Sequence, residues 1–120
     1  TERFDETGAK MRAIGHEYGA VTGRERRCGW IDLVALRYAI MINGVTQLIM
    51  MKSDVLDTFP TIKACTAYKV NGVETRDFPF SIENGIEPVY KELEGWQTEL
   101  ETPITIISIG PDREQTIVRN

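Results

Sequence analysis

The sequence of 120 residues predicts an α/β fold in which a mixed sheet is accompanied by few helices. Short apolar and β-branched runs recur along the chain, and glycine, proline and asparagine separate them, as is typical of strands and turns. Only residues 30–43 have a clear helical repeat of apolar side chains. Because 42% of the residues are hydrophobic and 27% are charged, we expect one globular domain or one piece of a larger domain.

The predicted helix covers residues 30–43, in which Leu33, Leu36 and Ile40 fall on one stripe. Since only two charged residues interrupt this segment, we expect most of its surface to be buried. The Asn43-Gly44 pair is expected to end the helix, because both residue types tolerate a left-handed backbone.

The predicted strands are short and are bounded by turn residues. Asn71-Gly72 is a strong signal for a hairpin turn, and Pro88 suits the start of a strand or an edge position. The β-branched run of residues 103–108 is expected to be a central strand. Residues 1–18 have a weaker pattern, that of a helix or a strand. The predicted strands are residues 46–51, 61–70, 73–76, 88–93, 103–108 and 114–119.

Charge and composition argue against several classes of function. The net charge of −4 is not that of a general nucleic-acid binder, which carries a basic surplus. No apolar run approaches the ~18 residues that span a bilayer, and the polar first residues resemble no secretory signal. Cys28 and Cys65 are therefore expected to be reduced thiols. The single histidine, His16, is expected to be exposed and cannot form a histidine-rich metal site.

The first candidate site is the segment of residues 19–27, which is rich in glycine and arginine. Glycine lets a backbone approach a ligand closely, and exposed backbone N–H groups can form a nest for an anion. Arginine adds a planar fork that binds a carboxylate or a phosphate through two hydrogen bonds. The segment therefore predicts a site for a phosphorylated or carboxylated small molecule. The alternative is a solvated basic loop that Glu25 partly neutralises.

Two further candidate sites follow predicted strands. Lys52-Ser53-Asp54 comes after the strand of residues 46–51, and Ser108-Ile109-Gly110 ends the strand of residues 103–108. Ligands of α/β sheets tend to lie at the carboxyl ends of strands. A carboxylate such as that of Asp54 can accept hydrogen bonds from the ring N–H and the exocyclic amine of guanine, whereas adenine offers no matching pair. The alternatives are a surface Lys–Asp pair and an ordinary strand-to-turn transition.

Taken together, these segments resemble those of the adenylosuccinate synthetase family. The similarity covers nearly the whole chain in the family's order, and its first and last motifs are long and specific. The matching segments are residues 18–30 (YGAVTGRERRCGW), 31–37 (IDLVALR), 52–57 (KSDVLD), 65–68 (CTAY), 95–96 (GW) and 107–113 (ISIGPDR).

The resemblance implies that residues 1–120 are a single carboxy-terminal portion of a P-loop-NTPase-like ligase fold. The family makes adenylosuccinate, in the biosynthesis of AMP, from IMP, L-aspartate and GTP. GTP first phosphorylates the purine 6-oxygen, and the amine of aspartate then displaces that phosphate. The family uses Mg²⁺ and is cytoplasmic and homodimeric. Neither a nucleic acid nor a membrane is an expected partner.

By resemblance, residues 20–26 form the mobile loop that closes over aspartate. Thr22, Gly23 and the arginines would hold the aspartate carboxylates, Arg24 would also reach the IMP ribose, and Arg26 would span toward GTP. The expected set for aspartate and IMP is Ala20, Val21, Thr22, Gly23, Arg24, Glu25 and Arg26.

The guanine pocket is expected from the two strand-end segments. Lys52 and Asp54 resemble the guanine clamp of the family, and Ser108 with Gly110 resembles the other side of the base pocket. The expected set for GTP is Arg26, Lys52, Ser53, Asp54, Ser108, Ile109 and Gly110. We therefore expect the arginine-rich loop and Asp54 to line a common cleft.

The chain also departs from the family. Family members are several times longer, and neither their glycine-rich phosphate loop with its catalytic aspartate nor their catalytic histidine has a counterpart here. We therefore expect no catalytic residue, no principal Mg²⁺ ligand and no turnover from the chain alone. The short stretch between Trp96 and Pro103 indicates a missing segment. Val21 replaces a common threonine, and Ser53 a common apolar residue. A non-catalytic anion- or nucleotide-binding module is the alternative function.

Overall fold

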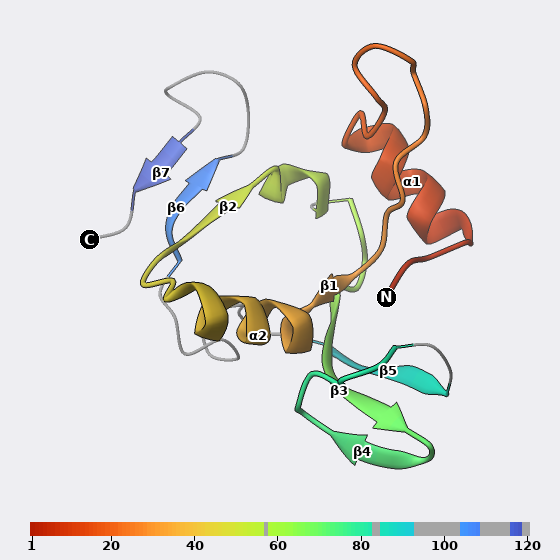
Figure 1. Cartoon of the computed structure of the whole chain (residues 1–120). Helices are drawn as coiled ribbons and strands as arrows, with labels where there is room; N and C mark the ends of the chain where they lie inside the picture. Colours follow the sequence, from red (N-terminus) through yellow and green to blue (C-terminus); the bar gives the residue numbers. More distant parts are fainter. Residues whose placement is uncertain (57, 83–84, 93–103, 109–115, 119–120) are drawn as a thin grey trace.

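The computed structural model describes residues 1–56, 58–82, 85–92, 104–108 and 116–118. Over these ranges the chain has the predicted mixed α/β architecture, in which helix α2 runs between two small sheets and helix α1 lies to one side (Figure 1). The elements in chain order are α1 (Glu6–Ile14), β1 (Ile31–Asp32), α2 (Leu33–Asn43), β2 (Leu48–Met51), the 3-10 turn η1 (Ser53–Leu56), β3 (Lys63–Val70), β4 (Val73–Thr75), β5 (Ile86–Glu92), β6 (Ile104–Ser108) and β7 (Thr116–Val118).

The first sheet is built around β3, which pairs in parallel with β1 and antiparallel with β4 and β5. The predicted hairpin turn is confirmed, because Asn71 and Gly72 have φ angles of 51° and 83° between β3 and β4. Strand β5 begins two residues before the predicted start, so Pro88 lies inside it, opposite Tyr68. Proline is tolerated there because, among the described strands, β5 pairs with β3 alone.

The second sheet contains β2, β6 and β7. Strand β6 is in the middle, parallel to β2 and antiparallel to β7, which confirms the predicted central strand within the described sheet. The register places Met51 opposite Ser108. Because the two strands are parallel, their carboxyl ends lie at the same edge of the sheet.

Helix α2 differs from the prediction at its start. It begins at Leu33, because Ile31 and Asp32 first pair with β3. The Asp32 carboxylate then caps the helix by accepting a hydrogen bond from the Ala35 N–H at 3.0 Å. At the other end Gly44 has a φ of 61°, which confirms the predicted left-handed stop.

Only one face of α2 is buried, so the prediction of a mostly buried helix is wrong for the described chain. Leu33 is fully buried against Ala64, and Leu36 and Ile40 pack on this pair, as the predicted stripe requires. The exposed fractions of Met41 and Ile42, however, are 67% and 60%. The β3 sheet covers the predicted stripe and leaves the adjacent apolar side chains of the helix in contact with solvent.

A partly buried hydrogen bond links the start of α2 to the first sheet. The Tyr68 hydroxyl donates to the Asp32 carboxylate at 2.5 Å, and Tyr68 packs with Val34 and Cys65 in one core cluster. Burial, followed by the hydrogen bond to Asp32, raises the pKa of Tyr68. Burial also raises the pKa of Cys65 to about 11. Both cysteines are free thiols, as predicted.

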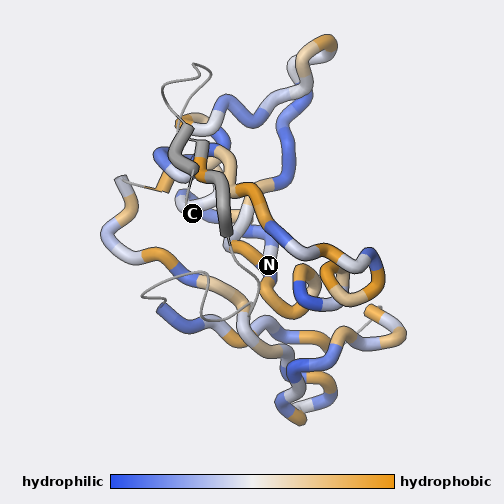
Figure 2. Tube along the Cα trace, turned by 90° about the vertical axis from the view of Figure 1, so that its left-hand side faces the viewer, coloured by the Kyte–Doolittle hydropathy of each residue, from blue (hydrophilic) through white to orange (hydrophobic). Residues whose placement is uncertain are grey.

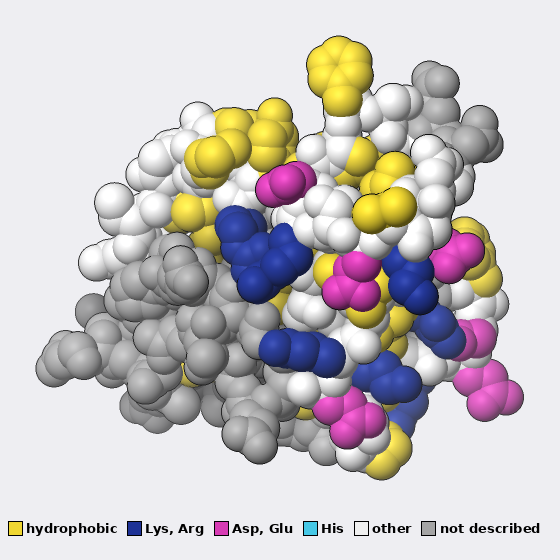
Figure 3. Space-filling model, turned by 90° about the horizontal axis from the view of Figure 1, so that it is seen from below, with side chains coloured by type: hydrophobic (Ala, Val, Ile, Leu, Met, Phe, Trp, Pro, Cys, Tyr) yellow, Lys and Arg dark blue, Asp and Glu magenta, His cyan; other side chains and the backbone are white. Residues whose placement is uncertain are grey.

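The surface is mixed in character. Figure 2 shows hydrophobic residues along α2 and the adjoining strands, whereas the stem of the segment that projects at the top is hydrophilic. On the face seen in Figure 3, lysine and arginine side chains are interspersed with acidic and hydrophobic ones. In the described part of the chain, neither helix has the length and hydropathy of a membrane-crossing segment.

The substitution Asp32→Ala is expected to lower the free energy of unfolding by about 2 kcal/mol. It removes the cap of α2 and leaves the buried Tyr68 hydroxyl without its acceptor. Urea denaturation measures the loss, and Asp77→Ala, at an exposed carboxylate, is the matched control. Equal stabilities of the two variants would contradict the assigned role of Asp32.

Candidate functional site

Residues 19–27, here called the arginine loop, form a short hairpin that projects beyond α1 (Figure 1). A bridge between Tyr18 and Glu25 closes its stem, and the Gly19 N–H donates to the Arg24 carbonyl at 2.8 Å. Gly23 has a φ of +67°, a conformation that a residue with a Cβ rarely adopts. The side chain of Val21 at the tip is 98% exposed. The loop therefore has an ordered stem and a tip that is open to solvent.

Helix α1 anchors the stem of the arginine loop through Arg12. The Arg12 Nε donates to the Arg26 carbonyl at 2.9 Å, and the guanidinium lies 3.4 Å from the Glu25 carboxylate. The Glu17 N–H in turn donates to the Arg12 carbonyl. These contacts fix the base of the loop on the end of α1 while its tip stays free.

The Glu17 carboxylate binds a cation from each of two candidate segments. Its Oε2 accepts from the Arg26 guanidinium at 2.9 Å, and its Oε1 accepts from the Lys52 ammonium at 2.7 Å. The Lys52 ammonium also donates to the Gly15 carbonyl at 2.7 Å. The hydrogen bond from Lys52, and secondarily that from Arg26, holds the pKa of Glu17 below its ordinary value despite partial burial. Two of the predicted site residues, Arg26 and Lys52, are thus brought together.

Of the two strand-end segments, Lys52 and Ser108 lie at neighbouring strand ends. Lys52 directly follows β2 and Ser108 ends β6, and the parallel register pairs Met51 with Ser108. Lys52 has a φ of 56°, so the backbone turns sharply at the end of β2 and enters η1 with Ser53. Asp54 in η1 is exposed to solvent. Ile109 and Gly110 lie outside the described residues.

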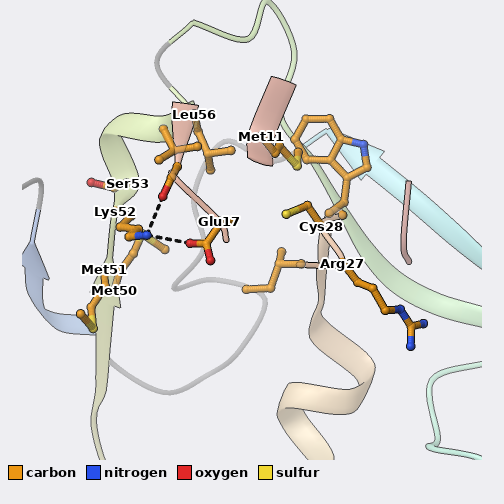
Figure 4. Close-up of a pocket in the computed structure, with 14 residues that line it drawn as sticks. Met11, Glu17, Arg27, Cys28, Met50, Met51, Lys52, Ser53 and Leu56 are labelled. Atoms are coloured by element: carbon orange, nitrogen blue, oxygen red, sulfur yellow. Dashed lines mark hydrogen bonds and ion pairs between the residues drawn. The ribbon is translucent and has the colours of Figure 1, made fainter. Parts of the chain in front are cut away.

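A cavity of about 380 Å³ opens between the arginine-loop stem, β1 and β2. Figure 4 shows Lys52 and Glu17 on one side of it and Met11 and Cys28 on the other, whereas the Arg27 guanidinium points away. Most of its surface is apolar, with the Glu17–Lys52 ion pair as a charged rim. The cavity is lined by Met11, Gly15, Glu17, Arg27, Cys28, Gly29, Trp30, Ile31, Met50, Met51, Lys52, Ser53, Val55 and Leu56.

The cavity only partly matches the predicted common cleft. Lys52 and Ser53 line it, but Arg24, Arg26 and Asp54 are not among the lining residues. The arginine loop nevertheless reaches the cavity through Arg27, and Glu17, which precedes the loop, lines the cavity as well. Sequence reasoning missed Glu17, because a single carboxylate between His16 and Tyr18 belongs to no recognisable motif. His16 itself is exposed, as predicted.

The described side chains provide no obvious metal centre. Over residues 1–56, 58–82, 85–92, 104–108 and 116–118, no group of three or more His, Cys, Asp and Glu side chains is placed to hold a metal ion.

These features define an α/β protein whose candidate ligand groups gather where parallel strands end, beside an arginine-rich loop. A family model described as adenylosuccinate synthetase matches residues 1–102. The chain belongs to the adenylosuccinate synthetase family.

The most similar relatives include two bacterial adenylosuccinate synthetases. The protein of Parabacteroides distasonis is 62% identical over 143 aligned residues, and that of Phocaeicola vulgatus is 63% identical over the same length. In each case the match covers 99% of this chain and 34% of the relative. The chain thus spans about a third of the length of these relatives.

A solved structure shows the same fold. The fully ligated adenylosuccinate synthetase of Plasmodium falciparum superposes with a TM-score of 0.90 at 31% sequence identity. The match covers 100% of this chain and 35% of that protein. The fold class predicted from the sequence is therefore confirmed.

The substitution Arg12→Ala is expected to loosen the arginine-loop stem, because it removes one hydrogen bond and one ion pair from it. A loss of about 1 kcal/mol would speed exchange of the Gly19 and Arg26 amide protons about fivefold. Hydrogen–deuterium exchange measures this change. Arg27→Ala is the control, because the Arg27 guanidinium pairs with Glu2 instead of the stem. Unchanged exchange in Arg12→Ala would contradict the anchoring role.

Proposed function

We propose that this chain is the aspartate-binding and guanine-recognising segment of a complete GTP-dependent ligase, which joins IMP and L-aspartate to form adenylosuccinate in AMP biosynthesis. The observation that carries the proposal is the meeting of Arg26 and Lys52 at one carboxylate. Arg26 belongs to the loop expected to hold aspartate and IMP, and Lys52 to the segment expected to hold guanine. Their proximity gives the two ligand-binding segments a common location.

The arginine loop supplies the groups for the anionic ligands. Its tip carries Thr22 and Gly23, and its stem carries Arg24 and Arg26, so donors are spread along the projecting hairpin. Guanidinium forks suit the two carboxylates of aspartate and the phosphates of a nucleotide. In this assignment Arg24 also reaches the IMP ribose, and Arg26 extends toward GTP. Phosphoryl transfer depends mainly on positioning and charge stabilisation. In the proposal these residues therefore contribute to catalysis without forming or breaking a covalent bond.

The end of the β2–β6 pair supplies the guanine pocket. The exposed Asp54 carboxylate is free to accept the two donors of a guanine edge, and the Lys52 stem can lie along the base. Ser108 lies at the neighbouring strand end, and Ile109 and Gly110 follow it in the sequence. A pocket built for two guanine donors rejects adenine, because the carboxylate would be left unpaired.

The rest of the enzyme would come from protein outside this chain. In the proposal it supplies the phosphate loop, the catalytic groups and the ligands of Mg²⁺, and the complete enzyme is a cytoplasmic homodimer. The aligned relatives extend over 143 positions whereas the chain has 120 residues, and the family model ends at residue 102. The greater length of the alignment supports a segment missing from this chain, which the proposal places between residues 96 and 103.

The substitution Asp54→Ala in the full-length synthetase is expected to abolish its preference for GTP over ATP, a change of at least about a hundredfold in the ratio of kcat/KM values. The matched control is Asp77→Ala, which removes an exposed carboxylate that follows β4. Steady-state kinetics with both nucleotides measures the ratio. An undiminished preference for GTP in Asp54→Ala would contradict the assignment of Asp54 to guanine recognition.

The isolated 120-residue chain is expected to form no adenylosuccinate from IMP, aspartate and GTP, because the groups that move the phosphoryl group are assigned to other parts of the enzyme. The absorbance change of the purine on formation of the product measures the rate. A rate above the buffer blank would contradict the assignment of the catalytic groups to other parts of the enzyme.

A further inference from the structure

Glu17 is the one residue of the described chain whose carboxylate contacts both the arginine loop and the end of β2. We propose that Glu17 is a positioning residue that couples the binding of the guanine nucleotide to the binding of the amino acid. This inference rests on the proposed function, since it takes Lys52 as part of the guanine site and the arginine loop as the aspartate site. It adds a specific residue through which one site affects the other.

The geometry of the carboxylate suits a bridge. Each of its oxygens accepts from a different cation, Arg26 at 2.9 Å and Lys52 at 2.7 Å. Both are charge-assisted hydrogen bonds, which are stronger than neutral ones. The side chain of Glu17 is 25% exposed, whereas those of Arg26 and Lys52 are 57% and 51% exposed. The more buried carboxylate is thus the fixed member of the triad, and it orients two cations that extend toward solvent.

The backbone makes the contact with the loop stem stiff. The Arg26 N–H donates to the Glu17 carbonyl at 3.0 Å, so Arg26 is joined to Glu17 by both its main chain and its side chain. The next rung of the stem is the bridge between Tyr18 and Glu25. A shift of Glu17 therefore moves the stem as a unit.

The contact with β2 is equally constrained. The Lys52 ammonium is held by the Gly15 carbonyl and by Glu17, and the Lys52 backbone has the left-handed φ of 56°. A ligand that packs on the Lys52 stem would restrict this side chain further. Because Glu17 is hydrogen-bonded to Lys52 and to Arg26, the position of its side chain, and with it that of the arginine-loop stem, would then be restricted as well.

The proposed coupling changes the free energy needed to order the tip of the arginine loop. Val21 at the tip is 98% exposed, so its side chain has no packing partner there among the described residues, and in this proposal aspartate restricts the tip on binding at an entropic cost. A guanine nucleotide that has already fixed Lys52, Glu17 and the stem reduces this cost. Binding of the two ligands is then mutually favourable, and linkage requires that each raises the affinity of the other by the same factor.

The test is a calorimetric titration of the full-length synthetase that carries this segment, with GDP and L-aspartate as probes in the presence of IMP. The dissociation constant of GDP is measured without aspartate and at saturating aspartate, and their ratio is the coupling factor. We expect a factor well above one for the unchanged protein. Glu17→Gln, which keeps the size but cannot accept from both cations as a carboxylate does, should lower it at least fivefold.

Two further variants sharpen the result. Glu2→Gln removes a carboxylate that pairs with the neighbouring Arg27 at 2.5 Å and does not touch Lys52, so the coupling factor should be kept. Glu17→Asp keeps the charge but shortens the side chain, so it should also lower the coupling factor. It replaces Glu17→Gln in the test if the glutamine variant does not fold. Melting temperatures report any purely structural loss, which would not by itself change the coupling factor.

The outcomes separate the inference from the proposed function. If both ligands bind but Glu17→Gln and Glu17→Asp retain the full coupling factor, or if the unchanged protein shows none, the role of Glu17 is overturned while the ligase assignment stands. If the unchanged protein binds neither GDP nor aspartate, the proposed function fails and this inference fails with it.

Discussion

The contact of the Glu17 carboxylate with Arg26 and Lys52 is the interaction on which the candidate site depends. These two cations are 26 positions apart in the chain, and the segments to which they belong are expected to bind different ligands. Because one partly buried carboxylate holds both, the arginine loop cannot be placed independently of the end of β2. The lowered pKa of Glu17, caused first by Lys52 and then by Arg26, means that this carboxylate stays ionised at neutral pH.

The surrounding fold supports this contact from two directions. Helix α1 ends next to Glu17 and fastens the loop stem through Arg12. Strand β2 delivers Lys52 at the edge where β6 also ends, since the two strands run in parallel. Helix α2 joins β1 to β2, and its start is fixed by Asp32, which caps the helix and accepts from Tyr68. The candidate site thus lies where a helix end, a loop stem and two strand ends converge.

Local patterns were sufficient to predict much of this architecture. The Asn71-Gly72 turn, the end of α2 at Gly44 and the central position of β6 each follow from residue types with narrow backbone or packing preferences. The start of α2 was predicted three residues too early, because the pairing of Ile31 and Asp32 with β3 depends on residues more than 30 positions away. The exposure of Met41 and Ile42 was missed for a similar reason, since an apolar helix face does not reveal which neighbour covers it.

The candidate site shows the same division between local and long-range information. The arginine loop was predicted from its glycine and arginine content, and the strand-end segments from polar residues that follow predicted strands. The family resemblance of these segments agrees with the comparisons. Glu17 was not found, because its importance comes from a contact with Lys52 across 35 positions. An ion pair of this kind leaves no periodic or compositional signal in a single sequence.

The most direct test of the central claim is a crystal structure of the full-length synthetase with GDP, IMP and aspartate bound. The account predicts that the guanine ring lies at the shared edge of β2 and β6 with its two donors on the Asp54 carboxylate. It also predicts that the tip of the arginine loop closes on the carboxylates of aspartate nearby. A guanine ring bound away from that edge, or an arginine loop that contacts neither ligand, would contradict it.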